Sequence, residues 1–167
     1  MLYFYIICFI IAIILIYASL YFIHREDIVL HQTNVYNFDF SLLYNKQPII
    51  IEDRVKELDE IVDSWFSPNI IFKYLIVDEI WKKNNFKYAI IYSINDTEVT
   101  LSHPYNNIDN YDAINPLFPL TTIKLKNNKF IIVPFKWKYN IENTNNVIIY
   151  GIHDYITYIL DILRIGI

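Results

Sequence analysis

KLKNNKFIIVPFKWKYNI, residues 124–141, is the stretch that decides the fold. Two apolar runs, TTIKL and KFIIVPF, flank the polar turn Lys126-Asn127-Asn128. Asn tolerates positive φ better than other non-glycine residues, and a two-residue type I′ turn needs positive φ at both central positions. The sequence therefore predicts a β-hairpin, followed by a proline and by two aromatic residues, Trp137 and Tyr139, that a lysine separates.

Other short strands lie on both sides of this hairpin. FKYAIIYSI (86–94) and EVTLS (98–102) flank Asn95-Asp96 and predict a second hairpin. PIIIED (48–53) and NVIIYGI (146–152) predict two further strands, and residues 104–119 a long polar loop. Because the chain has only two glycines, we expect asparagine to occupy the turn positions that need positive φ. The predicted turns or loop corners are the Asn-Asn pairs at 84–85, 106–107, 127–128 and 145–146.

Three segments between residues 54 and 166 are predicted to form helices. RVKELDEIVDSWF (54–66) places apolar residues at helical spacing with charges opposite. Ser67-Pro68 ends it and predicts a second helix to about Lys83, with Ser as N-cap and Pro at the first position. IHDYITYILDILRIG (152–166) carries one apolar stripe, with Asp154 near its start. We expect one α+β domain, a small antiparallel sheet packed with helices, over residues 48–167, preceded by a stalk or linker over 24–47 that packs on it.

The first 23 residues, MLYFYIICFIIAIILIYASLYFI, contain no charged side chain. About 20 apolar residues at a rise of 1.5 Å span a hydrocarbon core of roughly 30 Å. A cleaved signal peptide would need a basic start and a shorter apolar run, and a buried core helix is seldom so uniformly apolar. Residues 1–23 therefore predict a retained transmembrane helix that contacts the lipid bilayer.

Charge and cysteine usage indicate where the rest of the chain lies. Arg25 follows the span and no Lys or Arg precedes it, which favours the cytosolic side for the C-terminal domain. The single cysteine, Cys8, lies in the span, so the domain has no thiol for a disulfide. Asn95-Asp96-Thr97 is a glycosylation triplet, which would instead suit a lumenal domain. A nucleic-acid-binding domain normally carries a cluster of basic residues, whereas this chain has a net charge of −4. We therefore expect no nucleic-acid partner.

QPIIIED (47–53) and NNKFIIVPFKWKY (127–139) together resemble a cupin-like domain of the JmjC type. That family has a strand of the form kPvvirg and, later, a hairpin reading G-D-x-L-x-I-P-x-x-W-x-H. Ile132, Pro134 and Trp137 fall on matching positions, whereas Tyr139 stands where the family has its late histidine ligand. The earlier His-x-Asp/Glu pair has no counterpart, because no histidine lies between Gln32 and Ser102. The resemblance implies the family's shape without its iron site or oxygenase activity, and no cofactor.

Few polar residues have a spacing that points to chemistry. His103, Asp109, Asp112 and His153 could supply a metal site, but loops of this composition are more often solvated turns. The carboxylates Asp53, Glu57, Asp59, Glu60 and Asp63 fit the polar side of an amphipathic helix as well as acid–base work. We expect no catalytic, cofactor-binding or metal-binding residue and no small-molecule substrate. The abundant aromatic residues favour protein binding, with Trp65, Trp81, Trp137 and Tyr139 as candidate contacts.

The leading hypothesis is a single-pass membrane protein whose catalytically empty cupin-like domain binds other proteins. The bias toward Ile, Asn, Tyr, Lys and Phe, together with the short anchored architecture, resembles small membrane proteins of large AT-rich double-stranded DNA viruses. That resemblance implies a minor capsid or virion membrane protein that links an internal membrane to the capsid shell. One alternative is a membrane-tethered iron and 2-oxoglutarate-dependent enzyme with rearranged ligands. Another is a host-directed factor in the endoplasmic reticulum.

Overall fold

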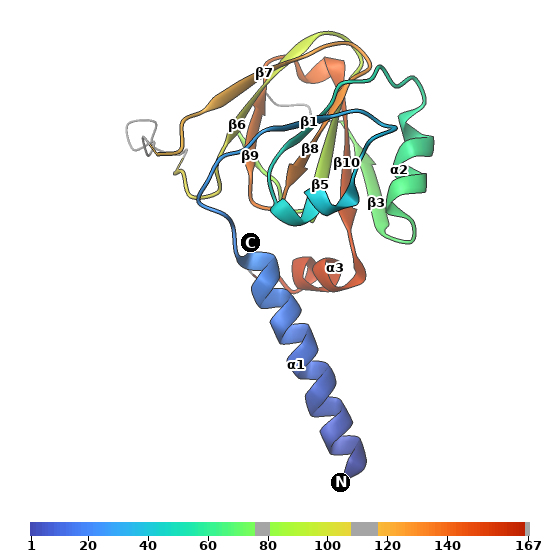
Figure 1. Cartoon of the computed structure of the whole chain (residues 1–167), viewed down its shortest axis with the longest axis vertical. Coiled ribbons are helices and arrows are strands. Elements are labelled where there is room, and N and C mark those ends of the chain that lie inside the picture. The colour runs from blue at the N-terminus through green and yellow to red at the C-terminus, as the bar shows by residue number, and fades with distance from the viewer. Residues whose placement is uncertain (76–80, 108–116, 166–167) are drawn as a thin grey trace.

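A long helix stands out from a body made of two β-sheets (Figure 1). The computed structural model describes residues 1–75, 81–107 and 117–165. Within these ranges the first sheet has the order β1-β2-β8-β5-β10-β3 and the second has the order β4-β9-β6-β7. The strands of the first sheet are β1 (His31–Thr33), β2 (Ile49–Ile51), β3 (Ile70–Tyr74), β5 (Tyr88–Ser93), β8 (Phe130–Pro134) and β10 (Val147–His153). The strands of the second are β4 (Lys82–Lys83), β6 (Thr97–Ser102), β7 (Thr121–Leu125) and β9 (Lys138–Ile141).

Both predicted hairpins are wrong, because each predicted turn carries the chain from one sheet to the other. β5 pairs with β8 and β10, and β6 pairs with β7 and β9. The two corners lie side by side, since the amide of Asn128 donates to the carbonyl of Ser93 and the amide of Ser93 donates to the carbonyl of Lys129. Asn128 has φ 62° as its residue type predicts, but Asn127 does not share it, so no type I′ turn forms. Long-range pairing therefore outweighs the local turn signal.

The space between the two sheets is filled by side chains. Trp137 and Tyr139 lie there among aliphatic residues of both sheets, and both are almost completely buried. Ile50, Ile91, Val99, Leu101, Ile131 and Ile149 belong to the same cluster. This double-sheet layout with mostly antiparallel pairing is the one that jelly-roll and cupin domains use. The structure agrees with the expected α+β class, although its strands form two sheets where one was expected.

The helix α2 (Leu58–Phe66) covers the outer face of the first sheet. Leu58, Val62 and Phe66 are buried against that face, so the predicted amphipathic helix forms, although it begins at residue 58 rather than 54. The predicted second helix is wrong. Ile70–Tyr74 instead forms β3, and all five of its residues pair with β10. Sheet pairing here outweighs the start signal of Ser67-Pro68, and residues 76–80 lie outside the described residues.

Residues 24–47, predicted as a stalk, contribute structure to the body. β1 lies within them and pairs in parallel with β2, and the short 3₁₀ helix η1 (Phe40–Asn45) places Leu43 in the core. The four predicted Asn-Asn corners all lie outside the strands, although Asn145-Asn146 falls in a 3₁₀ turn, η3 (Thr144–Asn146). The last helix, α3 (Tyr155–Ile162), is shorter than predicted because Ile152 and His153 belong to β10.

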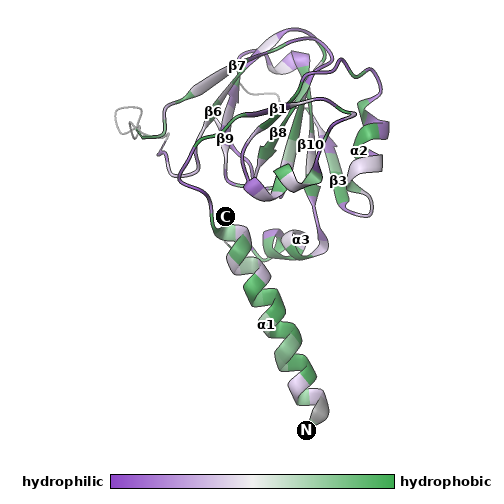
Figure 2. Ribbon diagram, in the orientation of Figure 1, coloured by the Kyte–Doolittle hydropathy of each residue, from purple (hydrophilic) through white to green (hydrophobic). Residues whose placement is uncertain are grey.

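The N-terminal helix α1 (Leu2–Phe22) extends away from the body for most of its length (Figure 1). Its segment Tyr3–Phe22 is long and apolar enough to cross a membrane, and its most apolar window is not buried against the domain. Figure 2 shows that almost all of α1 is coloured as hydrophobic, whereas the ribbon of the body alternates between hydrophobic and hydrophilic residues. The C-terminal end of α1 contacts the domain, where Ala18, Tyr21 and Phe22 make its apolar contacts.

Candidate functional site

The candidate site lies where the C-terminal end of α1 meets the body. Lys46, which directly follows η1, directs its ammonium group to the carbonyl oxygens of Leu20, Tyr21 and Ile23, the second at 3.0 Å. The last carbonyl groups of a helix have no partner within the helix, and a cation stabilises the negative end of its dipole. Lys46 therefore satisfies the end of α1 and fixes it to the body. Burial, with a contribution from Lys87, lowers the pKa of Lys46 to about 8.

A second polar contact ties α1 to both β5 and α3. The ammonium of Lys87 lies 2.6 Å from the carboxylate of Asp154 and 3.0 Å from the hydroxyl of Tyr17, and Tyr17 also donates to Asp154. Asp154 in addition caps α3 by accepting from the amide of Thr157 at 2.7 Å. Burial alone would raise the pKa of Asp154, but these donors hold it below its ordinary value. Burial likewise opposes the charged form of Lys87, and its partners raise its pKa overall.

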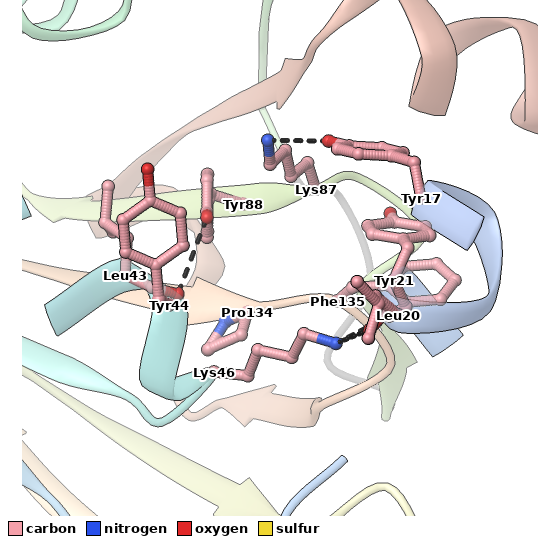
Figure 3. Close-up of a pocket in the computed structure, with 10 residues that line it drawn as sticks. All are labelled: Tyr17, Leu20, Tyr21, Leu43, Tyr44, Lys46, Lys87, Tyr88, Pro134 and Phe135. Atoms are coloured by element: carbon pink, nitrogen blue, oxygen red, sulfur yellow. Dashed lines mark hydrogen bonds between the residues drawn. The ribbon is translucent and has the colours of Figure 1, made fainter. Parts of the chain in front are cut away.

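A pocket of about 230 Å³ opens between these two contacts (Figure 3). Its walls come from α1, from η1 and from the strands β5 and β8 with the residue that follows β8. The lining residues are Tyr17, Leu20, Tyr21, Leu43, Tyr44, Lys46, Lys87, Tyr88, Pro134 and Phe135. Figure 3 shows the ammonium of Lys46 directed at Leu20 and that of Lys87 directed at Tyr17, so both cations already have partners. The remaining wall is apolar, which suits an apolar ligand or side chain better than an anion.

Aromatic rings close the junction beside the pocket. Tyr21 stacks on Phe135 with a centroid distance of 4.3 Å, and His24 lies almost parallel to the same ring at 6.1 Å. Neither ring nitrogen of His24 has a hydrogen-bond partner among the described residues, and its side chain is buried. Burial, together with the nearby charges of Lys46 and Lys136, lowers the pKa of His24 to about 4. His24 is therefore neutral at physiological pH.

The structure corrects two of the four candidate interaction residues. Trp137 is 2% exposed and Tyr139 is 3% exposed, so neither can contact a partner protein. The indole nitrogen of Trp137 donates to the carbonyl of Lys46 at 3.0 Å and so supports the lysine that holds α1. Burial raises the pKa of Tyr139, whose hydroxyl lies 3.5 Å from that of Tyr74. In this structure the position that the resemblance aligns with the family's late histidine is therefore a buried tyrosine, packed in the cluster between the two sheets.

The other two candidates lie nearer the surface. Trp65, on α2, is half-buried and stacks on Phe38 at a centroid distance of 4.2 Å, with Phe40 at its edge. Trp81 is half-buried as well. Either ring could take part in a protein contact with the part that remains exposed. Neither lies in the pocket lining at the junction.

The two histidines considered as metal ligands lie in separate surroundings. His103, after β6, stacks on Phe118 at 4.2 Å and has its Nε2 atom 2.9 Å from the carbonyl of Arg25. His153, at the end of β10, packs against Phe86 and has its Nδ1 atom 3.3 Å from the hydroxyl of Thr157. Burial lowers the pKa of both. Asp109 and Asp112 lie outside the described residues, and within the described ranges no three metal-binding side chains come together.

The candidate carboxylates have ordinary structural roles or face solvent. Asp53 accepts from the amide of Val35 at 2.6 Å. Asp59 pairs with Lys73 at 2.9 Å and accepts from the hydroxyl of Tyr150. The side chains of Glu57, Glu60 and Asp63 are exposed. The structure brings no two of them together at a cleft.

Sequence reasoning missed Lys46 and Lys87, the two lysines of the junction. Lys46 contacts carbonyls that lie 23 to 26 positions earlier, and Lys87 contacts residues 67 and 70 positions away, so no local spacing joins them. The one signal in the sequence is the isolated lysine of FKYAIIYSI, a charge within an otherwise apolar strand. A buried charge requires a partner, and that requirement alone predicts an ion pair at Lys87.

No family model and no curated protein matches the chain. Over part of its length it is similar to solved structures, among them the following two. One is WlaRA, a TDP-fucose-3,4-ketoisomerase from Campylobacter jejuni, with 17% identity, 50% of this chain and 57% of that chain covered, and a TM-score of 0.30. The other is RmlC from Streptococcus suis in complex with dTDP-D-xylose, with 10% identity, coverages of 65% and 62%, and a TM-score of 0.31. The chain spans less than two thirds of either protein.

Proposed function

We propose that the chain is a single-pass membrane protein whose β-sheet domain binds other proteins at the bilayer surface without catalysis. The observation that carries the proposal is the contrast between an apolar helix exposed along most of its length and a domain fixed to its end. Tyr3–Phe22 has the length and composition of a span, and Lys46 joins its last carbonyls to the domain. A fixed junction holds the domain at one height and in one orientation above the bilayer, which suits a connecting protein.

The filled space between the sheets supports a role other than catalysis. The position that corresponds to the family's late iron ligand is the buried, neutral Tyr139, packed among aliphatic side chains. His103 and His153 each lie in a separate aromatic environment. Among the residues that the structure describes, no group of ligands favours the alternative of an iron and 2-oxoglutarate-dependent enzyme with rearranged ligands. Stoichiometric iron in the purified full chain, lost in His103→Ala or His153→Ala, would support that alternative and contradict ours.

The membrane-proximal pocket is the surface that we propose for the protein partner. Tyr44 stands at its rim with a largely exposed ring, and tyrosine is enriched in protein interfaces. The sequence resemblance suggests a capsid or membrane protein of a large DNA virus as the partner. A photo-reactive amino acid at Tyr44, in the full chain in its native membrane, should give one discrete protein adduct. The same probe at Tyr36, which is exposed but absent from the pocket lining, is the matched control.

Membrane extraction tests the anchor itself. The full chain should stay with the membrane in carbonate or high salt and be released only by detergent, because about 20 apolar side chains leave lipid only at a large cost. Release by carbonate alone would overturn the proposal. We propose the cytosolic side for the domain, since Arg25 follows the span and no Lys or Arg precedes it. Glycosylation of Asn95 in a microsomal expression assay would show the lumenal orientation instead.

A further inference from the structure

The last helix, α3, lies beside the end of α1, at the base of the body on the side from which α1 extends (Figure 1). Ile156 and Leu160 pack against Ala18, Tyr21 and Phe22 of α1. Thr157 turns toward the body, where it meets His153. These inward residues account for one side of α3. Its position is therefore fixed by packing as well as by the capping carboxylate of Asp154.

The other side of α3 is apolar and exposed. Tyr155, Ile159 and Ile162 lie on one helical face, since spacings of four and three residues bring side chains together at 100° per residue, and Leu163, which directly follows α3, extends this face. Each of these side chains is more than half exposed. Soluble proteins rarely leave such a continuous apolar face in water. A short amphipathic helix of this kind, with a tyrosine at its edge, is suited to the boundary between headgroups and acyl chains.

The height of α3 along α1 identifies what covers this face. α1 has 21 residues, which corresponds to a length of about 31 Å and matches a hydrocarbon core of about 30 Å. The contacts with α3 fall on residues 18–22, in the last turns of α1, which is the level of the interface if the helix spans the bilayer. The exposed face of α3 thus lies where the membrane surface must pass.

We propose that the bilayer covers the outer face of α3, so that the domain has a second, peripheral contact with lipid in addition to its anchor. This inference rests on the proposed membrane function of α1. α3 then lies in the plane of the interface, with its apolar side in the lipid and its inner side on α1. The two contacts together prevent the domain from tilting about the end of α1. A second copy of the chain is the competing occupant, and the test below separates it from lipid.

Depth-dependent fluorescence quenching in the full chain tests the proposal. Cys8→Ser removes the single cysteine, and Ile159→Cys then carries an environment-sensitive fluorophore on the outer face of α3. Ile11→Cys marks the middle of α1, and Lys124→Cys marks the exposed strand β7 in the second sheet. Each labelled protein is reconstituted into phosphatidylcholine vesicles with lipids that carry a nitroxide either near the headgroup or deep in the acyl chain.

We expect the label at residue 159 to show blue-shifted emission and strong quenching by the shallow nitroxide. The label at residue 11 should respond to the deep nitroxide and the label at residue 124 to neither. Quenching at residue 11 without quenching at residue 159 would overturn the α3 contact and leave the anchor intact. Loss of quenching at both positions would overturn the anchor as well. A residue-159 label protected from water and from both nitroxides would show that protein, and not lipid, covers the face.

A charged variant checks that the face, rather than the label, causes the contact. Ile162→Glu, with the label still at residue 159, places a carboxylate one turn away on the same face. Shallow quenching should fall toward the level seen at residue 124, because a carboxylate resists transfer into the acyl region. Glu60→Gln on α2 is the matched control and should change nothing. Unaltered quenching in Ile162→Glu would overturn the proposal.

Discussion

The two short helices of the domain, α2 and α3, use their apolar residues in opposite ways. α2 buries Leu58, Val62 and Phe66 against the first sheet and presents carboxylates to the solvent. α3 buries little more than Thr157 and Leu160 and presents isoleucine, leucine and tyrosine outward. Both sequences have the helical periodicity of an amphipathic helix. The apolar face of such a helix indicates contact with an apolar environment. Its position in the structure decides whether that environment is the protein core or the lipid bilayer.

The largest expected difference between the two helices is the cost of truncating an apolar side chain. Phe66→Ala should lower the free energy of unfolding by about 3–5 kcal/mol, because it leaves a cavity under α2. Leu163→Ala on α3 should change it by no more than about 0.5 kcal/mol, since its side chain contacts solvent or detergent. Urea titrations of the full chain in detergent micelles measure both. Equal costs for the two variants would show that α3 is packed in a way the structure does not contain.

Lowering the pH should destabilise the α1–α3 side and not the α2 contact. The α1–α3 side contains the buried His24, whereas the α2 contact has no histidine. The pKa of His24 falls from its ordinary 6.5 to about 4 in the folded protein. Between pH 4 and pH 6.5 the unfolded chain therefore holds a proton on His24 that the folded protein does not. The contribution of neutral His24 to the free energy of unfolding is complete above pH 6.5 and is lost as the pH falls toward 4. The loss is at most about 3 kcal/mol. His103 and His153 add to it with the same sign.

The contribution of His24 follows from a comparison with His24→Phe, which keeps an aromatic ring beside Phe135. Unfolding free energies of both proteins are measured from about pH 7 down to about pH 4, across the range in which a histidine of this kind titrates. The variant should show the shallower decline. Identical declines would mean that His24 is solvated in the folded protein.

Helix capping gives the smallest of the three differences. Asp154 caps α3 and accepts from Lys87, whereas Glu57 at the start of α2 makes no side-chain capping bond. Asp154→Ala should cost about 1–2 kcal/mol through the lost cap, with a further cost from the half-buried Lys87. Glu57→Ala should stay within about 0.5 kcal/mol. Asp154→Asn retains the cap without the charge, so its intermediate cost would divide the two contributions.

Sequence reasoning succeeded where the deciding interactions are local. The apolar run of α1, the 3.6-residue period of α2 and the apolar stripe of α3 each lie within a few turns of sequence, whereas the cap that Asp154 provides for α3 was not predicted. It failed where pairing joins distant residues. The residues of β3 were predicted as part of a second helix but pair with β10, and both predicted hairpin turns are corners between the two sheets.

The candidate site could not be predicted for the same reason. Lys46, Lys87 and Asp154 lie far apart in the sequence and meet only when η1, β5 and α3 converge on the end of α1. Trp137 and Tyr139 were two of the four predicted contacts, because aromatic residues are enriched in protein interfaces. In the structure Tyr139 belongs to β9 of the second sheet and Trp137 directly precedes it, and both side chains are buried in the cluster between the sheets.

The parallel pair of β1 and β2 has a mechanical consequence. His31, Gln32 and Thr33 are the first residues after α1 to join a sheet, and they pair with Ile49, Ile50 and Ile51. β1 therefore attaches the segment that follows the anchor to one edge of the first sheet. Lys46 holds the end of α1, and the indole of Trp137 in turn donates to the carbonyl of Lys46. A pull on the anchor would act first on these three residue pairs and on the contacts at the end of α1, before it reaches the other strands of the sheet.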